Sequence, residues 1–556
     1  MALKAWIWLP GLLSIVPGAQ AAWIHVCGQP PKEGPVTVLT APGGEPLHAY
    51  VSDSPPPAGC QGFAIPVAAD QVKTIVQAPA TLFSTDRITL TGAVTNNRLS
   101  VSSVTADTPE PVSRPLPAPL RSNLLDKVQV RPFGVEERVQ LSLSTGRLAL
   151  TCQTGTMPAG VVLTVPWFLP EADMELQVTG AGRGQFQFQM ADALLASRGT
   201  AVGLGSFAAD ATAQPRSFSV PRGGLDRQRW HSLTIVCPLQ KAELDLESLQ
   251  LLSKSRSEAG RSTWVWRAQE WQDRSAELFA FSASHKIKVL FITVPVADGQ
   301  VSDGRRLAAF IQEAAKRRIA VWTVDGDPRM VLPDEQGAAI ARARAYATYN
   351  ATAEPQARLQ GMQFDVEPYL LPEYATAPQD WDRRYLDLVA ALHAAASGLE
   401  LEVVVPFWWG DRTELLEGLA PHVNSLSVMD YRTDPQEVYR FAVPFLDWGA
   451  RHAKRIRIAL EAGPVETETS WHYTKAPGGE LWLRRLGQIP VLLVLNEAAA
   501  NVGWLAFRQT QTRFHDGSAT SFRKNPAHLL SLLPALERDF SGWIQFGGIA
   551  LHELPR

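Results

Sequence analysis

The chain has 556 residues, of which 46% are hydrophobic and 19% charged, and its formal net charge at pH 7 is −3. This length exceeds one ordinary domain, since domains typically hold about 100–200 residues. A nearly balanced charge without a run of Lys and Arg excludes nucleic acid as the expected partner, because proteins that bind it carry a basic footprint.

A secretory signal is predicted over residues 1–21. Lys4 provides a positive start, residues 5–16 are apolar, and residues 19–21 read Ala-Gln-Ala, the small-x-small pattern of a cleavage site. The apolar stretch is short for a membrane span and is interrupted by a proline and a glycine. We therefore expect an exported protein, periplasmic or extracellular, without a transmembrane segment after cleavage.

Four cysteines, all in the first half of the chain, predict disulfides, because an even number in an exported protein is typical of paired thiols. Proximity favours Cys27 with Cys60 and Cys152 with Cys237, although four cysteines allow three pairings. No Cys/His cluster has the spacing of a metal site, so neither a metal nor another cofactor is expected.

Two β domains are predicted before the middle of the chain. Residues 22–104 alternate short β-prone runs with Pro/Gly turns, and the proline-dense residues 105–122 predict a stiff linker. Residues 123–252 show period-two strands typical of a β-sandwich, of the jelly-roll kind. The strand count and the final Glu-Leu-Asp-Leu-Glu-Ser-Leu pattern resemble carbohydrate-binding modules. A spacer domain without a ligand is the alternative.

Residues 260–556 alternate strands with amphipathic helical segments, a rhythm that predicts a closed (β/α)₈ barrel of the TIM type. An open doubly wound sheet would carry a Gly-rich phosphate turn, and none occurs here. A long loop is predicted over 463–490, and loops of that length at a barrel mouth are usually functional. The expected strands are 264–268, 289–294, 320–325, 361–367, 401–406, 423–431, 457–461 and 542–552.

Catalytic groups of such barrels come from the carboxyl ends of the strands. Because side chains alternate along a strand, the apolar positions face the helices and the polar ones face the barrel interior. This phase directs five side chains into one mouth: Asp365, Glu367, Tyr431, Glu461 and His552. Carboxylates gathered in this way suit glycosidic cleavage, which needs one protonated and one ionised group.

The roles follow from these positions. Glu367 is predicted as the general acid, Asp365 raises its pKa through like charge, Glu461 is the nucleophile or electrostatic partner, and Tyr431 orients a carboxylate. An ion pair is the alternative for any single carboxylate, and Arg457 is the obvious structural partner for one of them. Substrate binding is expected from Trp408, Trp409, Tyr369, Gln363, Asp325, Asp430 and His552.

Two short segments resemble the chitinase-type glycoside hydrolases of family eighteen. Residues 361–367 resemble the fourth-strand motif Asp-Gly-x-Asp-x-Asp-x-Glu, and residues 429–431 resemble the sixth-strand Met-x-Tyr. The resemblance implies a barrel that acts on a carbohydrate, with Glu367 as acid. The matching residues are Gly361, Asp365, Glu367, Met429 and Tyr431, whereas Gln360, Gln363 and Arg432 replace aspartates of the family and Asp430 matches nothing.

A second resemblance concerns Glu367-Pro368, which is similar to the Asn-Glu-Pro of retaining barrel glycosidases, with Val366 in place of the Asn. It implies that Glu461 is the nucleophile. The alternative from another class is a non-catalytic protein, a degenerate barrel that binds a polysaccharide during assembly or export of an envelope or exopolysaccharide. Both hypotheses share a polysaccharide or oligosaccharide as partner.

Overall fold

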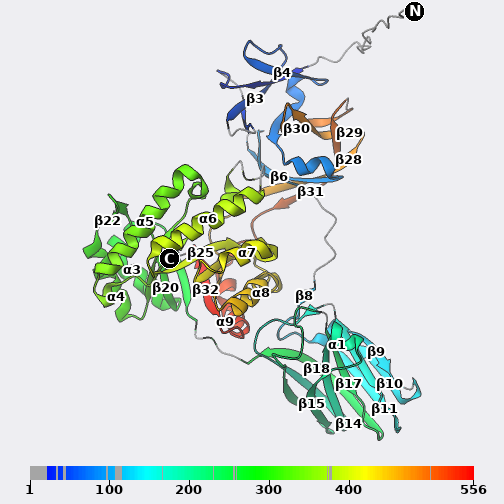
Figure 1. Cartoon of the computed structure of the whole chain (residues 1–556). Coiled ribbons are helices and arrows are strands. Elements are labelled where there is room, and N and C mark those ends of the chain that lie inside the picture. The colour runs from blue at the N-terminus through cyan, green and yellow to red at the C-terminus, as the bar shows by residue number, and fades with distance from the viewer. Residues whose placement is uncertain are drawn as a thin grey trace, which may run out of the picture. The chain divides into compact units, whose positions relative to one another are not determined.

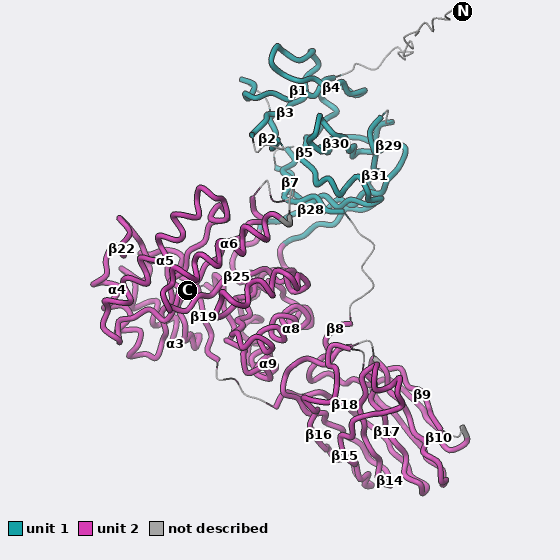
Figure 2. The backbone as a smooth tube through the Cα atoms, viewed as in Figure 1, with its two compact units in different colours: residues 1–111, 375–377, 466–516 teal, residues 112–374, 378–465, 517–556 magenta. Residues whose placement is uncertain are grey.

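The computed structural model describes residues 22–555 apart from 33–34, 42–44, 96–97, 107–114, 135, 166, 230, 255–256, 258, 372–373, 375–377 and 501–502. The predicted signal lies outside the described residues. The chain divides into two compact units, shown in Figure 2: 1–111 with 375–377 and 466–516, and 112–374 with 378–465 and 517–556. In the described part of the chain, no helix combines the length and apolar character needed to cross a membrane.

The first unit consists of two sheets, one with strand order β2-β3-β1-β4 and one with β5-β30-β29-β31-β28-β6-β7. The larger sheet joins N-terminal strands to strands from residues 466–516, so the predicted loop over 463–490 is wrong. Apolar residues of β30 pair with β5, for example Leu493 with Ile75. The strands are β1 (Ala22–Cys27), β2 (Thr37–Thr40), β3 (Pro46–Ser52), β4 (Cys60–Ile65), β5 (Val72–Gln77), β6 (Arg87–Thr95), β7 (Arg98–Ala106), β28 (Glu468–Ala476), β29 (Gly478–Leu486), β30 (Ile489–Ala500) and β31 (Leu505–His515).

The β domain after residue 115 is one hydrogen-bonded path of strands that divides into two sheets along a long strand, β14 (Met174–Asp192). Its first half pairs with β16 and β18, and its second half pairs with β15 and β17. Residues 174–192 therefore form one continuous strand that takes part in both sheets. The others are β9 (Gln129–Phe133), β10 (Val139–Ser144), β11 (Arg147–Cys152), β12 (Gly160–Val165), β15 (Val202–Ala209), β16 (Gln214–Ser219), β17 (His231–Val236) and β18 (Ala242–Ser253).

Both predicted disulfides are confirmed. Cys27 at the end of β1 is bonded to Cys60 at the start of β4, its direct partner in the strand register. Cys152 at the end of β11 is bonded to Cys237 just after β17, so this bond ties the two sheets of the sandwich together. Disulfides persist in oxidising compartments, which agrees with export, while the compartment itself stays a prediction.

The C-terminal region contains a closed barrel of eight parallel strands, which confirms the predicted closed barrel, while its assignment to the TIM type stays a prediction. Figure 1 shows helices on the outside of these strands. In order around the ring the strands are β19 (Arg261–Val265), β20 (Ile287–Ile292), β23 (Ala320–Asp325), β24 (Gly361–Phe364), β25 (Glu400–Pro406), β26 (Ser425–Met429), β27 (Arg455–Glu461) and β32 (Phe546–His552). The helices between them are α2 (Ala268–Asp273), α3 (Ser275–Ser284), α4 (Gly304–Lys316), α5 (Pro333–Thr352), α6 (Pro378–Ala396), α7 (Thr413–Leu419), α8 (Pro435–His452) and α9 (Pro526–Phe540).

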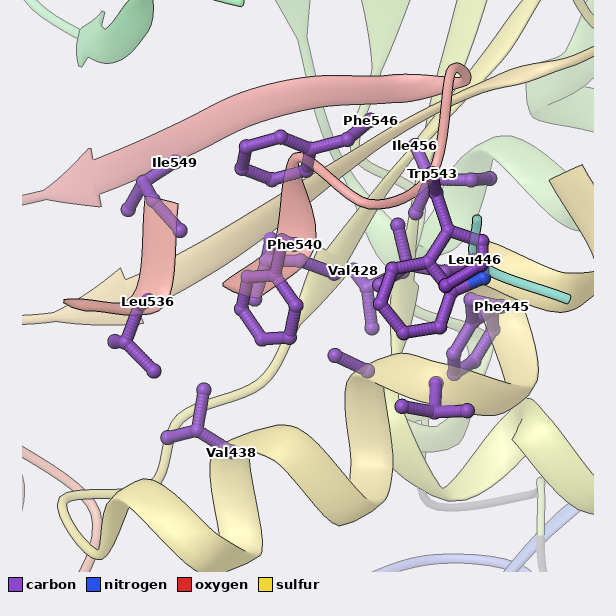
Figure 3. Close-up of a cluster of buried hydrophobic side chains, with 14 of the residues drawn as sticks. Val428, Val438, Phe445, Leu446, Ile456, Leu536, Phe540, Trp543, Phe546 and Ile549 are labelled. Carbon is purple, nitrogen blue, oxygen red and sulfur yellow. The ribbon is translucent and has the colours of Figure 1, made fainter. Parts of the chain in front are cut away.

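The core of the barrel follows the predicted side-chain alternation. Figure 3 shows the outer layer, in which Val428, Ile456 and Ile549 of three neighbouring strands lie among side chains of α8 and α9. A separate inner cluster holds Trp264, Phe291, Trp322, Val324 and Ala459. Apolar strand residues of one phase thus pack against the surrounding helices, and residues of the opposite phase fill the barrel interior.

Candidate active site

A pair of carboxylates follows β24 at the carboxyl end of the barrel. The backbone N–H of Asp365 donates to the Asp325 carbonyl at 2.8 Å, which continues the contact with the neighbouring strand. Glu367 accepts a hydrogen bond from the Tyr369 hydroxyl. Both carboxylates are half-buried, and Asp365 Oδ1 is buried without a hydrogen-bond partner in the described part of the chain. The two side chains predicted as acid and assistant therefore lie together, one of them firmly held.

The surroundings of this pair favour protonated carboxyls. Burial raises the pKa of Asp365, and the charge of Glu367 raises it further. Burial also raises the pKa of Glu367, and it outweighs the hydrogen bond from Tyr369 and the charge of His552, which act in the opposite direction. A pair of this kind can share one proton, which is the state that a general acid requires.

A glycine makes room for the acid pair. A Cβ atom on Gly326 would stand 2.4 Å from the Asp365 carbonyl oxygen and 3.0 Å from the Asp365 Cβ. Any other residue at this position would push Asp365 away from the β23 end. The position of the pair therefore depends on the first residue after β23, and the sequence offers no motif that marks it.

A second carboxylate of the mouth is occupied by two donors. Glu461, the last residue of β27, accepts from the backbone N–H of Gly463 at 2.5 Å through Oε1. Its Oε2 lies 2.7 Å from Nδ1 of His552, the last residue of β32. The Trp266 indole N–H lies 3.1 Å from His552 Nε2. Glu461, His552 and Trp266 thus form one hydrogen-bonded chain, which we call the Glu–His–Trp chain.

Tyr431 lies against this chain. Its ring stacks on the His552 imidazole, with centroids 6.0 Å apart and an interplanar angle of 19°. No hydrogen bond from the Tyr431 hydroxyl to a carboxylate occurs among the residues that the structure describes. Its pKa is raised by burial and, after that, by the negative charges of Glu461, Asp365 and Glu367, so all the predicted catalytic side chains share one electrostatic neighbourhood.

The aromatic side chains at the rim differ in exposure. Trp408 is 50% exposed, and its ring contacts Tyr369 edge-on at 5.1 Å. Trp409 is buried against Tyr385 of α6, with ring centroids 5.1 Å apart. The prediction that Trp409 binds substrate is therefore wrong, because the α6 side of the barrel covers it. Trp408 and Tyr369 present the aromatic surface that a sugar ring can reach.

Three other predicted substrate contacts are wrong because their side chains are buried, two of them in structural networks. Gln363 is enclosed inside the barrel, where it accepts from the Trp264 N–H at 2.6 Å and donates to Glu402 at 2.7 Å. Asp325 is on the opposite phase, facing α5, where it pairs with Arg342 and accepts from the Tyr346 hydroxyl at 2.5 Å.

Asp430 is the third of these. Its carboxylate is fully buried, and neither oxygen has a hydrogen-bond partner among the described residues. Burial raises its pKa far above the ordinary range, against the charge of Arg432. It has the phase of Leu426 and Val428, both in the outer core, so it points away from the mouth.

Sequence reasoning missed two side chains of this region, Tyr385 near the acid pair and Glu553 near His552. Tyr385 comes from the middle of α6, and its buried hydroxyl has no hydrogen-bond partner in the described residues. Burial raises its pKa, and the charges of Asp365 and Glu367 raise it further. Glu553 follows β32 with a left-handed backbone (φ 45°). A positive φ at a non-glycine residue was the kind of feature that only a structure reveals, because no turn signature precedes it.

The described residues include no group of three or more His, Cys, Asp or Glu side chains arranged to hold a metal ion. The carboxyl and imidazole groups of this site can transfer protons next to an aromatic rim.

No family model matches the chain, and no curated protein matches it. Solved structures with some similarity include the CBM22–GH10 modules of a Clostridium thermocellum endo-1,4-β-D-xylanase complexed with xylohexaose, with a TM-score of 0.26, 8% identity, and coverage of 61% of this chain and 81% of that one. Another is a family 29 carbohydrate binding module complexed with cellulohexaose, with a TM-score of 0.18, 9% identity, and coverage of 23% and 80%.

Proposed function

We propose that the protein hydrolyses glycosidic bonds of a polysaccharide, with Glu367 as the general acid. The observation that carries the proposal is the Asp365–Glu367 pair, two half-buried carboxyls with raised pKa at a barrel strand end. Trp408 and Tyr369 lie beside the pair and offer apolar faces to a sugar ring. Burial raises the pKa of Glu367, so its carboxyl keeps the proton to a higher pH and can donate it to the leaving oxygen.

The two carboxyls of the pair have different roles in the proposed reaction. Glu367 gives its proton to the glycosidic oxygen as the bond to the anomeric carbon breaks. The charge of Glu367 raises the pKa of Asp365, so the pair retains a proton in the resting enzyme. Asp365 stabilises positive charge at the sugar once its own carboxyl ionises. Tyr369 holds the Glu367 carboxyl in place. The partial match to the family-eighteen motif names the same two residues.

The test compares wild type with Glu367→Gln on soluble xylan, mannan, mixed-linkage glucan, dextran and chitosan. The substitution keeps an oxygen for the Tyr369 hydroxyl and removes only the acidic proton. We expect turnover to fall by about 10²–10⁴ with binding retained. Glu414→Gln, an exposed position in the first turn of α7, is the matched control.

The rival function has its own outcome in the same experiment. If wild type binds a polysaccharide with no release of reducing ends, and Trp408→Ala abolishes binding, the barrel is a binding protein and the catalytic proposal fails. The half-exposed Trp408 is the observation that favours this second function, polysaccharide binding without cleavage. If Glu367→Gln cleaves as fast as wild type, Glu367 is not the acid.

A further inference from the structure

The barrel order places His552 opposite the proposed acid. In the ring β19-β20-β23-β24-β25-β26-β27-β32, strands β24 and β32 are four positions apart, which is diametrically opposite in a closed ring of eight. Glu367 follows β24 and His552 ends β32. Inverting glycosidases need this arrangement, because the acid protonates the leaving oxygen on one face and a base activates water on the other.

Glu461 is built to orient His552. Both carboxylate oxygens are taken, Oε1 by the Gly463 N–H at 2.5 Å and Oε2 by His552 Nδ1 at 2.7 Å. Its side chain is only 8% exposed. A Cβ on Gly463 would stand 2.9 Å from Glu461 Oε1 and 2.3 Å from Glu553 Oε2, so glycine is needed for this contact. A carboxylate held in this way fixes the proton on Nδ1 of the imidazole.

The other ring nitrogen is left as an acceptor at the mouth. The Trp266 N–H donates to His552 Nε2 at 3.1 Å, which requires a lone pair on that nitrogen. Trp266 is half-buried, and the His552 side chain is 21% exposed, so solvent reaches both side chains. A water molecule that displaces the indole N–H donates its own O–H to the same lone pair. Stacking on Tyr431 keeps the ring in plane for this contact.

We propose that His552 is the general base of the reaction, that Glu461 is its positioning residue, and that hydrolysis inverts the anomeric configuration. This inference rests on the proposed glycosidase function and replaces the expected role of Glu461 as nucleophile. Water attacks the anomeric carbon and forms the new carbon–oxygen bond. Its proton passes to His552 Nε2, while Glu367 protonates the departing oxygen. Solvent then removes the proton from His552 and returns one to Glu367.

Electrostatics supports the imidazolium that this step creates. Burial lowers the pKa of His552, but the hydrogen bond and the charge of Glu461 outweigh burial and raise it overall. The negative charges of Glu553 and Asp365 act in the same direction. The positive ring that forms during attack is therefore stabilised by the carboxylate that already orients it.

The stereochemical outcome tests the proposal on the wild-type protein. Proton NMR of the first product from the polysaccharide that wild type cleaves distinguishes the two anomers before mutarotation equilibrates them. We expect the anomer opposite to that of the substrate. Retention of configuration overturns the base role of His552, because retention requires a covalent intermediate in place of direct attack by water. The proposed glycosidase function would still stand in that case. No cleavage of any polysaccharide overturns both.

Variants separate the base from the acid. With 2,4-dinitrophenyl glycosides the leaving group needs no proton, so Glu367→Gln should recover most of its activity, whereas His552→Gln should stay about 10²–10⁴ slower than wild type. Recovery of His552→Gln to the same extent overturns the proposal. The matched control is the exposed pair of His452 and Glu417, 3.0 Å apart, where His452→Gln should change nothing.

Glu461→Gln tests the positioning role by a sharper route. The Gly463 N–H requires an oxygen at Oε1, so the amide nitrogen must face His552 Nδ1. That nitrogen donates, which moves the imidazole proton to Nε2 and removes the lone pair. We expect turnover to fall up to about 10⁴-fold and the low-field Nδ1–H proton resonance of wild type to vanish. Loss of that resonance with unchanged turnover contradicts the positioning role.

Discussion

The buried ion pair inside the barrel makes a quantitative prediction. Glu402 of β25 is fully enclosed and accepts from Arg457 Nε at 3.0 Å. It also accepts from Gln363 at 2.7 Å and from the hydroxyls of Ser425 and Ser427 at 2.6 Å each. Arg457→Met leaves this carboxylate buried with no counter-charge. Breaking such a pair from one side costs about 3–5 kcal/mol, which lowers Tm by about 6–20 °C for a unit of this size.

The same two strands supply the control. Arg455 and Glu400, two residues earlier on β27 and β25, form the corresponding pair at the surface, with side chains 45% and 33% exposed. Exposed pairs are worth about 0–1 kcal/mol, so Arg455→Met should move Tm little. Scanning calorimetry on both variants measures the difference. Equal shifts in the two variants would refute the reasoning.

The change in the stability deficit of Arg457→Met with pH is a further test. In wild type, burial acts to raise the pKa of Glu402, but the charge of Arg457 and the neutral donors bring it below the usual range. Without Arg457, burial dominates and the folded-state pKa rises above the unfolded value. The folded variant then binds a proton more readily than the unfolded chain, so its deficit in stability should shrink as pH is lowered from about 7 to about 5. A deficit that grows on acidification contradicts this account.

Gly326→Ala should lower turnover about 10²-fold in steady-state kinetics, with binding kept, because the new Cβ displaces Asp365. The control is Gly337→Ala, a helical glycine with open space around it. Replacing Cys152 and Cys237 by Ser should lower the free energy of unfolding by roughly 4 kcal/mol, since the bond closes a loop of 85 residues; urea titration showing a loss under about 1 kcal/mol would speak against it. The raised pKa of Asp365 means that stability falls as pH rises from about 4 to about 8, and Asp365→Asn should flatten that decline in Tm; an unchanged slope excludes Asp365 as its source.

Much of the barrel could be predicted from the sequence because its strands separate two environments. Apolar residues such as Ile456 and Ile458 pack against helices, which leaves Arg457 and Glu461 inside, as the alternation indicated. Asp325 and Asp430 follow the same alternation, which directs their side chains outward. Their expected role in substrate binding rested on residue type and ignored this alternation. Phase was thus the stronger signal, and residue type alone was misleading.

The remaining features depend on long-range contacts. Tyr385 approaches the acid pair from a helix whose period marks only burial. The partner of Ile75 is Leu493, and no local pattern links strands so far apart in the chain. The function of Trp409 as packing rather than binding surface likewise depends on Tyr385, a contact that single-residue reasoning does not contain.

The sheet shared between the two ends of the first unit sets an order of events during synthesis. Strand β6 is complete long before β28, its neighbour, and β5 long before β30. At about 5–20 residues per second, the stretch between β7 and β28 takes the ribosome roughly 20–70 s. For that interval the N-terminal strands expose unpaired edges, the kind of surface that aggregates or recruits a chaperone. Strands β28 and β30 thus complete a sheet that β5 and β6 begin much earlier in synthesis. We expect a product truncated before β28 to be degraded and not to accumulate.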